Sequence, residues 1–272
     1  MQYKTIQGVS VPEIGLGTYR LHGKQCENAV RTALDVGYRH IDTAQMYQNE
    51  MEVGEAIKNS PVDREDVFLT TKLWLNNLEY EDVLRTTEES LDKLKTPYVD
   101  LLLIHWPSDQ YNLQRTLEAM LLLRDQGKVS NVGVSNFTMK WLQEANEEVR
   151  APIFCNQVEY HPFLGQFDLL DYAIEHDIMV TAYSPLAQGE VENNDELRQI
   201  AEKYNKSAAQ IALRWLIEQE QVVAIPKASS KEHLQANIDI FDFELSDEDF
   251  DTIDEMDKSK RLISPDFAPT WD

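Results

Sequence analysis

The chain has 272 residues, 42% of them hydrophobic, which is enough to bury the core of one domain of about 250 residues. Its 48 acidic and 25 basic residues give a formal net charge of −23, spread along the chain rather than gathered in a tail. Such a charge opposes binding to nucleic acids and to anionic membranes, because both bind through Lys and Arg. Two explanations fit the excess of acid: plain solubility, or adaptation to high salt, which screens self-repulsion.

The start of the chain and its cysteines predict where the protein resides. Residues 1–5 lack the basic-then-apolar layout of a signal peptide, and no apolar run approaches the roughly 18 residues of a membrane span. Cys26 and Cys155 are too few for a disulfide framework and are predicted to be packed thiols. The six histidines are scattered, without metal-ligand spacing. We therefore expect a soluble cytoplasmic protein with no metal ion.

The chain begins with a predicted β-hairpin over residues 3–12, which could close the bottom of a barrel. After it, apolar runs that suit buried strands alternate with helical patterns. The predicted strands cover residues 15–18, 39–43, 67–73, 99–105, 131–134, 153–158, 178–183 and 222–226. The predicted helices cover residues 24–36, 50–59, 80–94, 113–126, 139–149, 167–176, 194–204 and 231–237.

Eight strands alternating with helices predict the α/β class and a closed (β/α)8 TIM barrel. Two further helical segments, 207–219 and 246–256, do not fit the simple repeat and are expected as extra helices, each opened by a serine cap. Gly15 and Gly17 form a Gly-x-Gly, but no third glycine follows at the spacing of a Rossmann fold. No low-complexity linker interrupts the chain, so residues 1–272 are expected to form a single domain.

Four polar residues stand at or just after the C-terminal ends of three predicted strands. Asp42 ends one strand, with Tyr47 in the loop after it; Lys72 ends the next, and His105 follows the apolar run 99–104. In a barrel of parallel strands, those ends carry the active site. Lys72 is expected to lower the pKa of Tyr47, while Asp42 keeps the lysine charged. With His105 orienting a substrate oxygen, the set suits protonation of a carbonyl.

Each of these residues also has a structural explanation. Asp42 and Lys72 could be an ordinary buried ion pair, and a histidine at a strand end is often a core residue. Lys72 could also form a Schiff base with a keto substrate, as in aldolases. Because four such residues share one rim, the catalytic interpretation is favoured.

The remaining strand ends carry groups that suit a flat polar cofactor. Ser135-Asn136 ends one strand with hydroxyl and amide groups that could hold a carboxamide, and Asn156-Gln157 ends the next. Tyr183 offers a ring for stacking on a heterocycle, although an isolated tyrosine is more often packing. Lys227 stands beside a predicted helix start, where barrels commonly bind phosphate, although an isolated lysine is more often solvated.

Several motifs together resemble the aldo-keto reductases. They are the stretches 37–50, 71–74 and 103–107, followed in the family's order by 133–137 and 225–227, so the resemblance covers essentially the whole chain. It implies an NADP-dependent oxidoreductase that reduces aldehydes and ketones to alcohols, with NADH as a possible replacement for NADPH. Within the family the chain is most similar to the shorter bacterial 2,5-diketo-D-gluconate reductases. Candidate substrates are therefore 2,5-diketo-D-gluconate, methylglyoxal and other small carbonyl compounds.

The resemblance also implies roles for individual positions. Tyr47 would be the general acid, Lys72 and Asp42 its tuning pair, and His105 the residue that orients the carbonyl. The carboxamide would be held by Ser135, Asn136 and Gln157, the nicotinamide ring by Tyr183, the pyrophosphate by Ser184 and Leu186, the 2′-phosphate by Lys227 and Ser229, and the adenine by Asn237. The substrate pocket would be lined by Tyr19, Trp74 and Trp106.

The chain departs from the family pattern at the cofactor tail. His233 and Ala236 stand where the family often has arginine and glutamate, and Lys231 could supply the missing charge. The tail after Arg261 is brief, so less chain is expected to close over a substrate. Family members are often monomeric, which predicts a monomer. The alternative on this fold is a regulatory protein that binds NADPH with little turnover.

Overall fold

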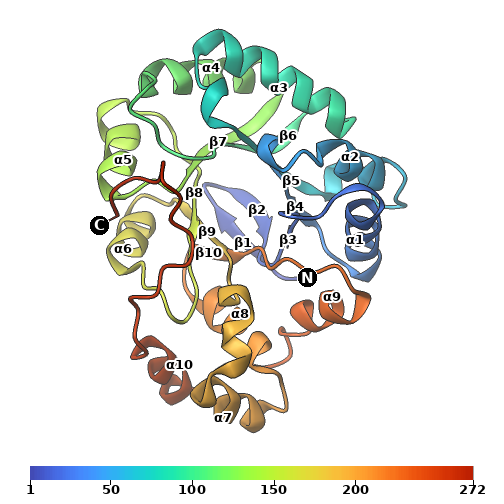
Figure 1. The fold of residues 1–272 in the computed structure, drawn as a ribbon, viewed down its shortest axis with the longest axis vertical. Coiled ribbons are helices and arrows are strands. Elements are labelled where there is room, and N and C mark those ends of the chain that lie inside the picture. The colour runs from blue at the N-terminus through green and yellow to red at the C-terminus, as the bar shows by residue number, and fades with distance from the viewer. Residues whose placement is uncertain (272) are drawn as a thin grey trace.

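The structure is a computed structural model that describes residues 1–271; Asp272, the last residue of the predicted domain, lies outside the described part. Eight parallel strands form a curled sheet in the order β10-β9-β8-β7-β6-β5-β4-β3. A parallel bridge between Ile14, just before β3, and Ala224 of β10 joins the two edges of the sheet. Helices surround the sheet (Figure 1), so the predicted α/β TIM barrel is confirmed.

The bounds of the strands follow the prediction to within a residue or two. They are β1 (Tyr3–Ile6), β2 (Val9–Pro12), β3 (Leu16–Gly17), β4 (His40–Asp42), β5 (Phe68–Leu73), β6 (Val99–Ile104), β7 (Val129–Ser135), β8 (Cys155–Glu159), β9 (Met179–Tyr183) and β10 (Val222–Ala224). Most positions of β5 to β10 are buried, as expected for strands of a parallel sheet covered by helices.

The helices also lie where the periodicity predicts them. They are α1 (Gly23–Val36), α2 (Glu50–Lys58), α3 (Tyr80–Leu94), α4 (Leu113–Asp125), α5 (Met139–Gln143), α6 (Phe167–Glu175), α7 (Asp195–Tyr204), α8 (Ala208–Glu218), α9 (Lys231–Ile238) and α10 (Asp247–Asp254). None of these helices within residues 1–271 is long and apolar enough to cross a membrane.

One predicted helix changes its type along its length. The segment 139–149 is α-helical only as far as Gln143, and Glu144–Glu148 forms a π-helical turn. The Val149 amide donates to the Glu144 carbonyl at 2.9 Å, which is an i to i−5 bond. A π-turn inserts one residue into the helical repeat, and apolar periodicity over so short a segment does not resolve it.

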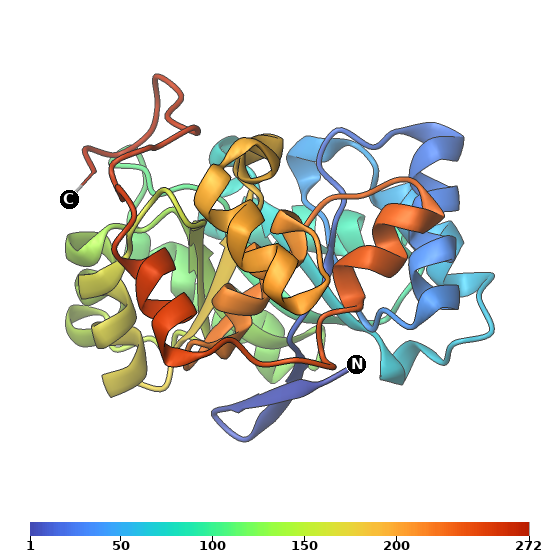
Figure 2. The ribbon, with the colours of Figure 1, turned by 90° about the horizontal axis from the view of Figure 1, so that it is seen from below.

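The N-terminal hairpin closes one end of the barrel. Gln7 and Gly8 form its turn with φ of 47° and 79°, which matches the twist of the two strands it joins. Ile6 and Val11 of the hairpin join a buried core cluster with Phe154 and other side chains of the barrel. Figure 2 shows the hairpin and the C-terminal tail at opposite ends of the barrel. The tail therefore lies at the end where the parallel strands terminate.

The two extra helices, α8 and α10, are present and capped as predicted. Ser207 accepts a hydrogen bond from the Gln210 amide, and the Gln210 side chain accepts from the Ser207 amide, which forms a capping box on α8. Ser246 caps α10 by accepting from the amide three residues ahead. The buried Trp215 indole donates to Asp254 at 2.9 Å and joins the two helices.

The two cysteines are packed thiols. Cys26 and Cys155 are free and buried. Burial raises the pKa of each thiol to about 12. Since the thiolate is the reactive form, neither cysteine is activated at neutral pH.

Candidate active site

The C-terminal ends of β4, β5 and β6 bring the four predicted polar residues together. In register, Asp42 lies opposite Thr70 of β5, and Lys72 lies opposite Leu103 of β6. His105 directly follows β6. Tyr47 ends η1 (Gln45–Tyr47), a short 3₁₀ turn in the loop after β4. Adjacent parallel strands thus place side chains from three separate motifs at one rim.

Lys72 and Asp42 form a buried ion pair at the centre of this rim. The Lys72 Nζ donates to Asp42 Oδ1 at 2.5 Å, to the Thr43 carbonyl at 2.9 Å and to the Tyr47 hydroxyl at 3.4 Å. Burial lowers the pKa of Lys72 below its usual 10.5, and the Asp42 carboxylate opposes that change. Three contacts use all three ammonium protons, so the geometry does not favour Lys72 as a Schiff-base nucleophile.

The pKa of Tyr47 shifts in the direction opposite to the expectation from the sequence. Burial raises it well above 10, and the charge of Asp42 acts in the same direction. Loss of solvation of the phenolate therefore outweighs the contact with Lys72. As a result Tyr47 keeps its proton at neutral pH, which is the protonation state that a proton donor requires.

His105 lies beside Tyr47 as a neutral ring. Its imidazole packs edge-on against Tyr47 and Trp74, with centroid separations of 5.6 and 5.2 Å. Burial lowers the pKa of His105 well below 6.5, and the charge of Lys72 lowers it further. A neutral imidazole can donate one hydrogen bond to a carbonyl oxygen without being a source of positive charge.

The residues predicted to hold a carboxamide form one hydrogen-bonded group with this rim. The Ser135 hydroxyl donates to the Gln157 carbonyl at 2.9 Å, and Asn136 Nδ2 donates to the His105 carbonyl at 3.0 Å. Tyr183 donates to Asn136 Oδ1 at 2.7 Å. These contacts fix the Asn136 amide just after β7 and the Tyr183 ring that ends β9.

Gln157 also makes a contact that the sequence did not reveal. Its Nε2 donates to Asp42 Oδ2 at 2.8 Å, while Asp42 Oδ1 accepts from Lys72. Both carboxylate oxygens of the buried aspartate are therefore occupied. The predicted cofactor residues and the predicted proton donor share one connected set of hydrogen bonds.

The remaining predicted cofactor residues follow β9 and β10 along the chain. Ser184 and Leu186 are half-buried after β9, and Ser184 has a φ of 47°. Lys227 and Ser229 are exposed between β10 and the N-terminus of α9. Asn237 is buried in α9 beside the hydroxyl of Tyr38. Amides, a ring and then a cation at a helix start, in strand order β7 to β10, fit the successive parts of a nicotinamide dinucleotide.

The predicted substrate residues form an aromatic wall beside Tyr47. The ring of Tyr19 lies 5.1 Å from that of Tyr47, and Trp74 contacts His105. Trp106 is buried at 5% exposure. Such a wall offers an apolar surface to a small bound molecule.

The C-terminal tail completes this wall, which the sequence analysis did not predict. Phe267 packs edge-on against Trp74 and Trp106, with centroid separations of 5.7 and 5.4 Å, and Trp271 lies 6.1 Å from Trp106. The brief tail after Arg261 therefore reaches the substrate wall with two aromatic rings. The sequence signal that could have indicated this contact is the presence of two aromatic residues, Phe267 and Trp271, in a short C-terminal segment without helical or strand periodicity.

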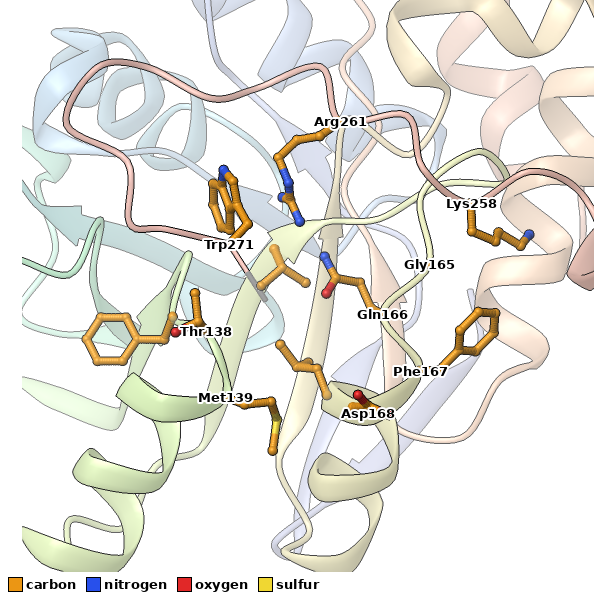
Figure 3. A pocket seen from close by; sticks show the side chains of 12 residues that line it. Thr138, Met139, Gly165, Gln166, Phe167, Asp168, Lys258, Arg261 and Trp271 are labelled. Carbon is orange, nitrogen blue, oxygen red and sulfur yellow. The ribbon is translucent and has the colours of Figure 1, made fainter.

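A groove of about 280 Å³ lies on the other side of the tail. Figure 3 shows Arg261 and Trp271 side by side in it, and the guanidinium lies 3.7 Å from the indole centroid. The starts of α5 and α6 supply the opposite wall, through residues such as Met139 and Gln166. Trp271 thus contacts the aromatic wall on one face and this groove on the other.

Within residues 1–271, no group of three or more His, Cys, Asp or Glu side chains is arranged to hold a metal ion.

Comparison with known proteins gives one consistent result. The sequence profile described as "Aldo/keto reductase family" matches residues 13–258. Glyoxal reductase of Bacillus subtilis (strain 168) is 44% identical over 261 residues, which cover 95% of this chain and 94% of that protein. Methylglyoxal reductase DkgB of Escherichia coli O157:H7 is 39% identical over 97% of this chain and its own full length.

Solved structures agree with the sequence matches. A crystal structure assigned provisionally as a 2,5-diketo-D-gluconic acid reductase B has a TM-score of 0.97 and 40% identity, and it covers 100% of this chain and 98% of its own. MGS-M4, an aldo-keto reductase from a deep-sea metagenome library, has a TM-score of 0.94 and 40% identity, with 98% of this chain and 99% of its own covered.

Proposed function

The chain belongs to the aldo/keto reductase family, and from that premise we propose that it reduces small aldehydes and ketones to alcohols with NADPH. The observation that carries the proposal is the connected set Tyr47–Lys72–Asp42–Gln157. It joins a protonated phenol, a buried cation and an amide of the predicted cofactor site by hydrogen bonds of 3.4, 2.5 and 2.8 Å. A structural ion pair alone would not need the phenol or the amide.

The proposed reaction uses each side chain of the rim for one step. Tyr47 donates its proton to the carbonyl oxygen, and the neutral His105 ring donates a hydrogen bond that orients the same oxygen. The positive charge of Lys72 stabilises the phenolate that remains on Tyr47. NADPH, when bound, would supply the hydride that the carbonyl carbon accepts.

NADPH is proposed over NADH because of the charges after β10. Lys227 and Ser229 are exposed at the start of α9, and Lys231 and His233 lie exposed in its first turn. A lysine, a hydroxyl and the positive end of a helix favour an additional phosphate group. No other predicted cofactor position bears on this choice.

The proposed substrates are small carbonyl compounds such as glyoxal, methylglyoxal and 2,5-diketo-D-gluconate. Relatives and a structural neighbour that cover nearly the whole chain carry the names of these substrates. The wall of Tyr19, Trp74, Trp106 and Phe267 is apolar and offers little that would select one small aldehyde strictly. We therefore expect a broad preference.

Tyr47→Phe tests the proposal. It removes only the hydroxyl, so turnover of methylglyoxal should fall by about 10²- to 10⁴-fold. The NADPH dissociation constant, measured by fluorescence titration, should change little because no predicted cofactor contact is lost. Tyr172→Phe is the matched control, because its hydroxyl bonds Asn146 and Glu147 away from the rim.

The substrate panel should include methylglyoxal, aromatic aldehydes and 2,5-diketo-D-gluconate, each with NADPH and with NADH. Normal turnover by Tyr47→Phe would disprove the proposed proton donor. Tight NADPH binding by the wild type without turnover of any substrate would favour the regulatory alternative.

A further inference from the structure

Glu159 is a buried acid that the proposed reaction does not use. It ends β8, two residues after Gln157, and its side chain is 0% exposed. A carboxylate in such a position is unfavourable unless several donors surround it. Its partners therefore indicate what it does.

The carboxylate of Glu159 binds the beginning of the C-terminal tail. Its Oε1 accepts from the Leu262 amide at 2.8 Å, and its Oε2 accepts from the Ile263 amide at 2.9 Å. The Nε2 of the buried His161 lies 3.1 Å from Oε1. Because His161 Nδ1 accepts from the Phe163 amide at 3.3 Å, Nε2 carries the ring proton and is a third donor.

Other contacts hold the chain just before this point. The Lys260 amide donates to the Phe163 carbonyl at 2.8 Å, and the Gly165 amide donates to the Lys258 carbonyl at 3.1 Å. A salt bridge between Lys260 and Glu190 lies at the surface. These contacts end at residue 260, and the Glu159 carboxylate binds the chain further along, at residues 262 and 263, nearer to Phe267.

Beyond Ile263 the tail is held differently. The Trp271 indole donates to Ser264 at 3.0 Å, and the Ala268 amide donates to the Pro265 carbonyl at 2.8 Å, so both hydrogen bonds close the tail on itself. Contact with the substrate wall is made by the rings of Phe267 and Trp271. Where these rings sit therefore depends on where the tail leaves the barrel.

We propose that Glu159 is a positioning residue that sets substrate selectivity by fixing the tail whose Phe267 and Trp271 rings complete the substrate wall. The inference rests on the proposed function, because selectivity is defined by turnover. Two charge-assisted hydrogen bonds to consecutive amides fix both the position and the direction of the chain. A carboxylate can accept from both, whereas a glutamine offers only one oxygen and turns a donor toward the second amide.

The test compares Glu159→Gln with Glu190→Gln. Both remove one negative charge from a residue that touches the tail segment, but only the first acts on residues 262 and 263. In Glu159→Gln, KM for 4-nitrobenzaldehyde should rise by about fivefold or more, while kcat with methylglyoxal stays within about twofold, since a small substrate makes little contact with the tail. Glu190→Gln should change neither.

Two readouts separate positioning from general damage. Hydrogen exchange of the Leu262 and Ile263 amides should accelerate in Glu159→Gln and remain slow in Glu190→Gln. The triple variant Glu159→Gln, Phe267→Ala, Trp271→Ala should be no more impaired with 4-nitrobenzaldehyde than the double variant Phe267→Ala, Trp271→Ala, because both rings that Glu159 is proposed to position are already absent. The proposal would be overturned if adding Glu159→Gln multiplied the loss already caused by removing the tail rings. It would also be overturned if Glu159→Gln lowered kcat equally with both substrates.

If Glu159→Gln does not fold, Ile263→Pro tests the same contact from the tail, because proline has no amide proton to donate. It should reproduce the rise in KM for 4-nitrobenzaldehyde, and unchanged selectivity would overturn the proposal. A wild-type protein that reduces no aldehyde would instead disprove the proposed function. Hydrogen exchange at residues 262 and 263 would still test the anchor itself in that case.

Discussion

The buried rim and the C-terminal tail meet at one site but are held by different forces. Asp42 and Lys72 sit on barrel strands, are almost fully buried and are joined by charged hydrogen bonds. Residues 264–271 contact the wall through rings, and Phe267 remains 46% exposed. Displacing a half-exposed ring should lower the free energy of unfolding only slightly, because few contacts are lost. Breaking a buried ion pair should lower it much more, because one charge is left without its partner.

This difference indicates that separate parts of the protein can serve proton transfer and substrate selectivity. The groups proposed to move the proton depend on the register of β4, β5 and β6, which the whole barrel maintains. The groups proposed to contact the far side of the substrate depend on a short segment fixed at its root. Changes in the tail can therefore alter selectivity without disturbing the chemistry.

Of the variants considered, Lys72→Met should have the largest combined effect on stability and turnover. It leaves the buried Asp42 carboxylate with the Gln157 amide as its remaining side-chain partner, so the free energy of unfolding should fall by about 3–5 kcal/mol. Turnover of methylglyoxal should fall by about 10²-fold or more, because the phenolate of Tyr47 loses its cation. Urea unfolding and NADPH oxidation measure the two effects.

The double variant Lys72→Met, Asp42→Asn is the control for that prediction. Replacing the carboxylate with an amide removes the uncompensated charge, so part of the lost stability should return while turnover stays low. If turnover returned together with stability, the lysine would act only as a structural partner of Asp42.

The effect of pH on turnover should be much smaller than the effect of Lys72→Met. Burial raises the pKa of Tyr47 well above 10, and burial with the charge of Lys72 lowers the pKa of His105 well below 6.5. Neither group should titrate between about pH 5.5 and 7.5, so kcat with methylglyoxal should vary less than about twofold there. A tenfold change that vanishes in His105→Gln would contradict a neutral histidine.

The same shift predicts how His105 affects stability. Below about pH 6.5 the unfolded chain protonates this histidine while the folded chain does not. The unfolded state then binds more protons, so this residue makes the free energy of unfolding fall as the pH falls. Wild type and His105→Gln should therefore differ in the slope of stability against pH on the acid side.

The barrel and the rim could be predicted because both follow local patterns. Apolar runs such as 99–104 indicate buried parallel strands, and the ends of such strands converge at one face of a barrel. That convergence brings Asp42, Lys72 and His105 together without any knowledge of their contacts. The extra helices likewise have local cap signals, as Ser207 shows.

What could not be predicted depends on contacts between distant parts of the chain. Gln157 and Asp42 are 115 positions apart, and no local pattern links them. Glu159 binds backbone amides, which carry no sequence signature. Phe267 belongs to a segment without a helical or strand period. The shift of the Tyr47 pKa is set by burial, and its sign depends on how completely the loops cover the phenol.

One measurement tests the division between chemistry and selectivity most directly. It is the ratio of kcat/KM for 4-nitrobenzaldehyde to that for methylglyoxal, determined for wild type, Tyr47→Phe and Phe267→Ala. Tyr47→Phe should lower both values and leave the ratio nearly unchanged, whereas Phe267→Ala should lower the ratio by about fivefold and leave methylglyoxal turnover intact. The account would be contradicted if Phe267→Ala lowered both values equally, or if Tyr47→Phe impaired only one substrate.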